Sequence, residues 1–251
     1  MSGHSKWSTI KHKKAAEDAK RGKIFTRLAR EIAVAAREGG GDPDINFSLR
    51  LAIDKAKSAN MPKDNIERAI KRGTGELKGA ELVEMTYEGY GPNGIALLVQ
   101  TLTDNKNRTV SDIRRVFGRQ GGSLAEAGSV AWQFSRKGYI TIAPDGIDPD
   151  TLFEVAVDAG AEDVEFGDDL IEVHVAIEHF QAVRQALEKA SIPCASAEMT
   201  MVPQTTMQLE EKETVRVMKL IDALEELDDV QQVYSNLDIT DEMIAQYETL
   251  S

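Results

Sequence analysis

The chain has 251 residues, with 30 lysines and arginines against 42 aspartates and glutamates, and a formal net charge of −12. Hydrophobic residues make up 41% of it, which is ordinary for a globular protein and excludes a disordered or fibrous chain. The apolar run at 94–99 is far shorter than the roughly 20 residues that cross a bilayer, and no apolar stretch follows the basic N-terminus as in a signal peptide. We therefore expect a cytoplasmic protein.

The sequence offers little for catalysis or for metal binding. A single cysteine, Cys194, cannot form an internal disulfide, and there is no Cys/His cluster with zinc spacing. We interpret Cys194 as a small, semi-buried residue rather than a nucleophile. Walker, GxSxG and HExxH motifs are absent. We expect no catalytic residue, no metal and no cofactor, and hence no enzyme.

The charge is divided unevenly along the chain. Residues 1–78 hold 18 basic against 10 acidic side chains, a net of +8, and the remainder holds 12 against 32, a net of −20. Such a split is typical of a region built for an anionic partner, followed by a part that phosphate would avoid. We interpret the acidic residues near the C-terminus, such as Asp228 and Asp229, as solvating the surface.

The first 22 residues form a basic segment with too few apolar residues to bury, so we expect an extended arm, of which 14–21 could become helical on binding. Trp7 within it would either stack on a base or pack on the helices that follow. Its cations are the first candidates for phosphate contacts: Lys6, Lys11, Lys13, Lys14, Lys20 and Arg21.

Three helices are predicted next, at 23–38, 44–59 and 62–73. Apolar residues recur at helical spacing in each, Gly39–Gly41 stop the first helix, the last ends at Gly73, and Pro62 suits a first helical turn. Cations lie opposite the apolar face of the outer two helices, and the strongest candidates there are Lys23, Arg27, Arg68 and Arg72. Each such row is also what an ordinary solvated helix face shows, but the neighbouring arm favours phosphate contact.

The rest of the chain predicts two α+β sandwiches. Residues 135–203 follow the order strand, helix, two strands, helix, strand, which is ferredoxin-like: 139–142, 150–159, 163–166, 170–176, 178–190 and 197–202. Segments on both sides of it supply the other sandwich, with strands at 82–90, 95–102, 130–134, 205–209 and 230–235 and helices at 107–120 and 213–227. We therefore expect an α+β fold of three domains: 1–78, a discontinuous domain of 79–134 and 204–251, and the inserted domain 135–203. Arg108, Arg115 and Arg119 share one face of helix 107–120 and are secondary candidates for phosphate contacts.

Several motifs together resemble the YebC family over the whole chain. They are Gly3–Trp7, Lys11–Ala16, Lys20–Phe25, Gly39–Pro43, Asn60–Pro62, Tyr87–Pro92 and Asp104–Thr109. The resemblance implies a helical first domain, two α+β domains and a cytoplasmic, non-enzymatic role. Members are named probable DNA-binding transcriptional regulators, and the family also includes a mitochondrial translational activator and bacterial factors linked to ribosomes stalled at proline runs. It supplies no catalytic residues to carry over.

Three functions remain open at this point. A DNA-binding transcriptional regulator would prefer a duplex and a defined sequence. A translation factor would contact ribosomal RNA or tRNA on the ribosome, and a basic arm before acidic domains suits an RNA-walled site. A protein-interaction scaffold would use the acidic domains, and deleting residues 1–22 would then change little.

We predict that Lys13→Glu combined with Lys14→Glu weakens binding to nucleic acid broadly. Each lost phosphate contact should flatten the slope of log K against log salt by about one unit, because fewer counterions are released. Binding measured over a salt series checks this. An unchanged slope would show that the arm is not the contact surface.

Overall fold

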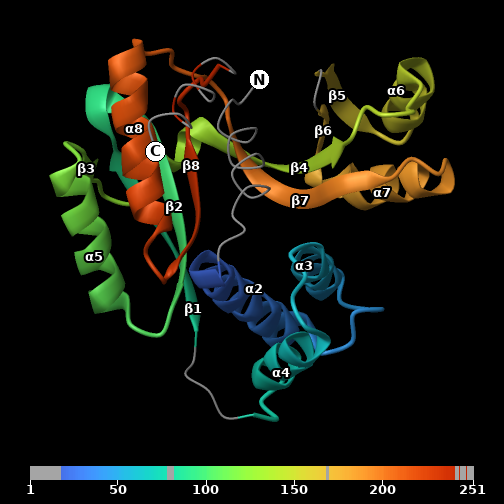
Figure 1. Cartoon of the computed structure of the whole chain (residues 1–251), viewed down its shortest axis with the longest axis horizontal. Coiled ribbons are helices and arrows are strands. Elements are labelled where there is room, and N and C mark those ends of the chain that lie inside the picture. The colour runs from blue at the N-terminus through green and yellow to red at the C-terminus, as the bar shows by residue number, and fades with distance from the viewer. Residues whose placement is uncertain (1–17, 78–81, 168–169, 241–242, 244–246, 248–251) are drawn as a thin grey trace. The chain divides into compact units, whose positions relative to one another are not determined.

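The computed structural model describes residues 18–77, 82–167, 170–240, 243 and 247 of the chain (Figure 1). The arm at 1–17 lies outside this range. The described chain forms two compact units, one of residues up to 134 and from 203 onward, and one of 135–202. The α+β fold class is confirmed, whereas the exact boundaries of three domains stay a prediction.

Three helices make up the N-terminal part: α2 (Asp18–Gly39), α3 (Phe47–Ser58) and α4 (Lys63–Gly73). Both α3 and α4 pack against α2 around a core that includes Ile32, Leu49 and Ile66 (Figure 1). Residues 18–22, expected in the extended arm, are helical, since Gly22 merely lowers helix propensity by about 1 kcal/mol.

Asn46 fixes the connection from α2 to α3. Its side-chain oxygen accepts from the Leu49 amide at 3.0 Å, and its side-chain nitrogen donates to the carbonyls of Ala35 at 2.8 Å and Gly40 at 2.7 Å. The N-cap therefore starts α3 at Phe47 rather than at Asp44 as predicted. A tight turn through Asn60, whose φ of 58° is left-handed, then leads to α4.

The α+β part of the first unit is an antiparallel sheet of order β3-β1-β2-β8. The strands of the sheet are β1 (Val83–Tyr90), β2 (Ala96–Thr103), β3 (Ser123–Leu124) and β8 (Val230–Ser235). Two helices pack on it, α5 (Lys106–Arg119) and α8 (Glu211–Glu225). Side chains such as Val99, Phe117, Ile221 and Val233 join sheet and helices in one core. Both helices accordingly bury their apolar faces against this sheet.

Two strand predictions in this part are wrong. Residues 131–133 form a short 3-10 helix, because the Glu88 carboxylate accepts the amides of Val130 and Ala131 that a strand would use for pairing. Residues 205–209 supply only an isolated bridge between Met207 and Leu237.

The second unit has the ferredoxin-like element order and the sheet order β5-β6-β4-β7. It consists of β4 (Phe134–Ile142), α6 (Pro149–Asp158), β5 (Ala161–Phe166), β6 (Ile171–Val175), α7 (Phe180–Lys189) and β7 (Cys194–Pro203). Cys194 is half-buried, and its burial raises the pKa of the thiol, which makes it a poor nucleophile. None of the helices described is long and apolar enough to span a bilayer.

Glu88 of β1 should be a main stabilising residue of the first unit. Its carboxylate accepts from the amides of Gly128 at 2.6 Å, Val130 at 2.7 Å and Ala131 at 2.8 Å. We predict that Glu88→Ala lowers the free energy of unfolding by roughly 2–4 kcal/mol, because three amides, of which that of Val130 is buried, lose their acceptor. Urea unfolding measures this, and Glu126→Ala, an exposed carboxylate of the same loop, should change stability by less than about 0.5 kcal/mol.

The stabilisation by Glu88 should depend on pH. Burial raises the pKa of this carboxyl, but the three amides lower it more, so the net pKa is below the usual value. The contribution is therefore present above the unfolded pKa of about 4.3 and is lost as pH falls through the folded pKa. The stability gap between wild type and Glu88→Ala should shrink on acidification, and a gap that stays constant would contradict this role.

Candidate nucleic-acid interface

The basic face of α2 is directed largely at the chain's own backbone. Lys23 Nζ donates to the carbonyl of Glu226, and Arg30 Nη1 donates to the carbonyl of Asp228 at 2.7 Å. At the other end of the helix, Arg37 donates to the carbonyl of Leu82 at 2.5 Å. These cations bind carbonyl groups of the segments beside the sheet, so they join α2 to the α+β part.

Arg27, another predicted phosphate contact, is half-buried. Burial lowers the pKa of its guanidinium, while the nearby charges of Glu225 and Glu31 raise it. Its Nε is buried and meets no hydrogen-bond acceptor among the described residues. The structure thus places both Lys23 and Arg27 beside the acidic segment that connects α8 and β8.

Asp229 is the centre of a buried polar network at this junction. Its carboxylate accepts from Arg108 Nη2 at 2.7 Å, from Thr109 Oγ1 at 2.8 Å and from Thr103 Oγ1 at 3.2 Å. Arg30 Nη1 adds an ion pair at 3.3 Å. Only 7% of the Asp229 side chain is exposed, so the interpretation of this acidic segment as solvated surface is wrong for this residue.

The pKa values of this network follow from the hydrogen bonds. Burial raises the pKa of Asp229, but the bonds from Arg108 and Thr109 lower it more, so the net pKa is below the usual value. The bond to Asp229 raises the pKa of Arg108, which also pairs with Asp104 at 2.9 Å. Arg108 is therefore a paired cation that is already bound to its own chain.

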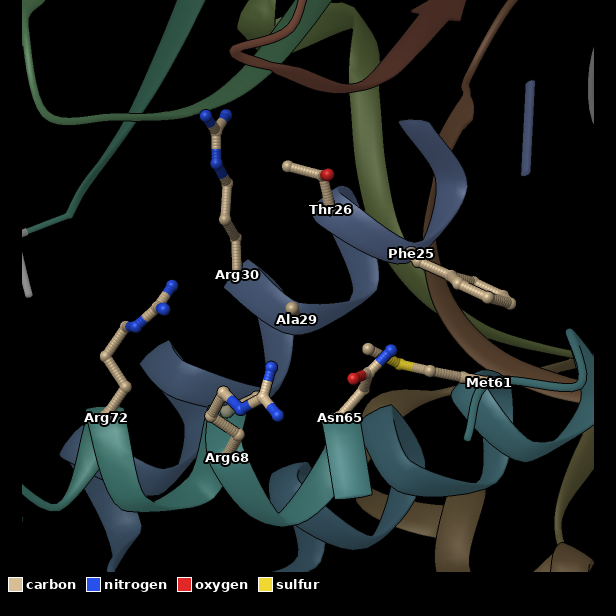
Figure 2. A pocket seen from close by; sticks show the side chains of 9 residues that line it. Phe25, Thr26, Ala29, Arg30, Met61, Asn65, Arg68 and Arg72 are labelled. Carbon is tan, nitrogen blue, oxygen red and sulfur yellow. The ribbon is translucent and has the colours of Figure 1, made fainter. Parts of the chain in front are cut away.

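A groove of about 350 Å³ runs between α2 and α4 and carries an excess of positive charge. Arg68 and Arg72 rise from α4 beside it, and the guanidinium of Arg30 points away toward Asp229 (Figure 2). None of the described residues that line it is acidic: Phe25, Thr26, Ala29, Arg30, Met61, Asn65, Arg68, Ala69 and Arg72. In a chain with net charge −12, a phosphate at this groove would meet arginines and neutral side chains but no carboxylate among the described lining residues.

A second depression, of about 500 Å³, has the opposite character. Three cations and five carboxylates line it: Lys23, Arg30, Arg108, Asp104, Asp112, Glu226, Asp228 and Asp229. Because the carboxylates outnumber the cations, an incoming phosphate would be repelled there. The contrast identifies the α2–α4 groove as the candidate anion site.

The remaining residues predicted to contact nucleic acid lie in several parts of the chain. Arg115 pairs with Asp112 at 2.8 Å on α5, and Arg119 is exposed in the last turn of that helix. Lys20 and Arg21 belong to α2, but their side chains are outside the description. The arm residues are likewise outside it: Lys6, Trp7, Lys11, Lys13 and Lys14.

The structure adds Phe25, Met61 and Asn65 to the site, which sequence reasoning missed. Asn65 precedes Arg68 by three residues and Arg72 by seven, so the helical period places all three on one face of α4. The helical spacing of Asn65 from the two arginines could therefore have been found in the sequence. The contribution of Phe25 and Met61 could not, because it depends on how α2 packs against α4.

Comparison with known proteins matches both parts of the chain to one family. The model for the "TACO1/YebC protein N-terminal domain" matches residues 5–76, and that for the "TACO1/YebC second and third domain" matches residues 82–237. A "Probable transcriptional regulatory protein" of Desulfosudis oleivorans is 57% identical over 96% of this chain and 98% of its own. One from Acidithiobacillus ferrooxidans, with the same name, is 56% identical over the full length of both chains.

The fold is similar to a solved structure as well. The crystal structure of a conserved hypothetical protein from Aquifex aeolicus matches with a TM-score of 0.84 and 48% identity, over 92% of this chain and 96% of that one. These matches define an α+β protein with a helical N-terminal domain followed by a second and a third domain. The chain belongs to the TACO1/YebC family, which confirms the resemblance found in the sequence.

We predict that Asp229→Asn lowers the free energy of unfolding by roughly 2–4 kcal/mol, because Arg108, Arg30 and two threonine hydroxyls lose a charged acceptor. Since the pKa of Asp229 is lowered, this stability is present above about pH 4 and is lost as pH falls through the folded pKa. Urea unfolding at several pH values tests both statements. Asp104→Asn, which breaks an exposed pair on the same arginine, should cost less than about 0.5 kcal/mol.

Proposed function

We propose that the protein is a non-enzymatic, nucleic-acid-binding regulator of gene expression, and that Arg68 and Arg72 hold phosphates at the α2–α4 groove. The observation that carries this is the acid-free lining of the groove in a strongly acidic chain. Both arginines are exposed, and the guanidinium group is suited to phosphate oxygens. The names of the relatives, as regulatory proteins, support the same class.

The partner in this proposal is either DNA or the RNA of the translation machinery. A transcriptional regulator would insert one helix into the major groove, usually with its N-terminal residues at the bases. The first turns of α4 expose Asp64 and Glu67 there, and these carboxylates would face the phosphates of the duplex. This arrangement favours the second candidate, a translation factor that contacts ribosomal RNA or tRNA on the ribosome.

The contrast between the acid-free α2–α4 groove and the acidic remainder of the chain also tests the third alternative, a protein-interaction scaffold. An interaction protein that uses only its acidic parts would not depend on the groove. It would keep its partners when Arg68 and Arg72 are both replaced by alanine, so that double variant separates this alternative from nucleic-acid binding.

We predict that Arg68→Ala combined with Arg72→Ala weakens binding to purified ribosomes or to genomic DNA fragments at least tenfold at moderate salt. The slope of log K against log salt should fall by about two units, one for each lost phosphate contact. The matched control is Arg216→Ala with Lys219→Ala, which removes two exposed cations from α8. It should leave both quantities unchanged.

Ribosomes and DNA measured side by side identify the partner. Tight, saturable ribosome binding with weak DNA binding would support the translation role, and a sequence-selective DNA complex would support the transcriptional one. Equal affinities for the groove variant and the control variant would overturn the proposed function.

A further inference from the structure

We propose that the α2–α4 groove takes an unpaired nucleotide, with its phosphate on Arg68 and Arg72 and its base against Phe25 and Met61. The inference rests on the proposed function and deepens it, because it names the form of nucleic acid that the site recognises. It distinguishes a single-stranded segment from the backbone of a duplex.

The groove has two chemically different ends. Arg68 and Arg72 stand at one end, and Phe25 and Met61 form an apolar wall at the other (Figure 2). Phe25 also packs against the core of the three helices, so its ring is held in place. A phosphate group alone would use the arginines and leave the apolar end in water, whereas a nucleotide has one part for each end.

Small residues make room between the two ends. Ala29 of α2 and Ala69 of α4 line the groove with no atoms beyond Cβ, so a flat group can approach both helices. The volume of about 350 Å³ lies at the lower end of the range for ligand pockets, which is roughly 300–1,000 Å³. Met61 is largely buried, and because a methionine side chain is unbranched it can adapt to the shape of a base that lies against it.

Asn65 lies between the arginines and the apolar wall (Figure 2). It is half-buried, and its amide offers both a donor and an acceptor. Recognition of unpaired bases relies on such hydrogen bonds to the base edge together with contacts to its faces. Asn65 is therefore placed to bond the edge of a base whose ring lies against Phe25 and Met61.

A duplex cannot use this groove fully. Its phosphates can reach the exposed Arg68 and Arg72, but its bases are stacked inside and cannot reach Phe25 or Met61. The neighbouring Glu67 and Asp64 would in addition meet the phosphates of a second strand. The apolar end of the groove is accordingly useful only for a base that is already free of pairing.

The test is fluorescence anisotropy of the full-length protein with four labelled oligonucleotides of equal length at one salt concentration. They are a single-stranded RNA, a single-stranded DNA of the same sequence, the corresponding RNA duplex, and a single strand with abasic positions. We expect at least fivefold tighter binding of a single strand than of the duplex or the abasic strand, as expected for loss of base contacts. Comparing the affinities for the single-stranded RNA and the single-stranded DNA shows which of the two nucleic acids the groove prefers.

Two variants act on the base end of the groove. Ala29→Leu fills the space from a half-buried position on α2 without removing any core side chain, and Asn65→Ala removes the amide. Both should lower affinity for the single strand at least fivefold and leave duplex and abasic affinities within twofold. Circular dichroism confirms that each variant is folded, and Arg216→Ala with Lys219→Ala again serves as the control.

The outcomes separate this inference from the proposed function. Wild-type protein that binds duplex and abasic strand as tightly as the intact single strand would overturn the inference, while Arg68→Ala with Arg72→Ala would still weaken every complex. A folded Ala29→Leu variant that binds all four probes as wild type does would overturn it as well. Failure of the arginine variant to weaken any complex would instead overturn the proposed function.

Discussion

The need to satisfy the buried carboxylate of Asp229 constrains how α2 lies beside the sheet. Isolated in an apolar interior the carboxylate would be costly, so it must gather donors, and it does so from three segments: the end of β2, the start of α5 and the middle of α2. Thr103 and Thr109 supply neutral hydroxyls, and Arg108 and Arg30 supply charge. One side chain thereby connects the helical part of the chain with the α+β part.

This constraint divides the cations of the N-terminal part into two groups. Lys23 and Arg30 bind carbonyls and carboxylates near the turn after α8, and the half-buried Arg27 faces the same acidic segment. Arg68 and Arg72 on α4 face an acid-free groove instead. A phosphate competes with acidic side chains at the first group and with water at the second, so the second group is the better candidate for nucleic-acid binding.

Much of the fold could be predicted from local patterns. The three helices, the ferredoxin-like order of the second unit and most strands follow from apolar periodicity and turn residues. The predicted strand at 130–134 is wrong because of a contact between residues that are far apart in the sequence. The amides of Val130 and Ala131 are taken by Glu88, more than forty residues earlier in the chain, and such a partner leaves no local signal.

The sequence by itself determined the family, the helical and α+β parts, and the concentration of positive charge in the first 78 residues. It also placed Arg68 and Arg72 on one helix face, since the period of a helix is a local property. Only the tertiary structure decided which cations are available, because charge pairing depends on which distant residues are neighbours. Lys23 and Arg68 are alike on the helical wheel, and they differ because the segment around Asp228 lies against the first and an open groove lies beside the second.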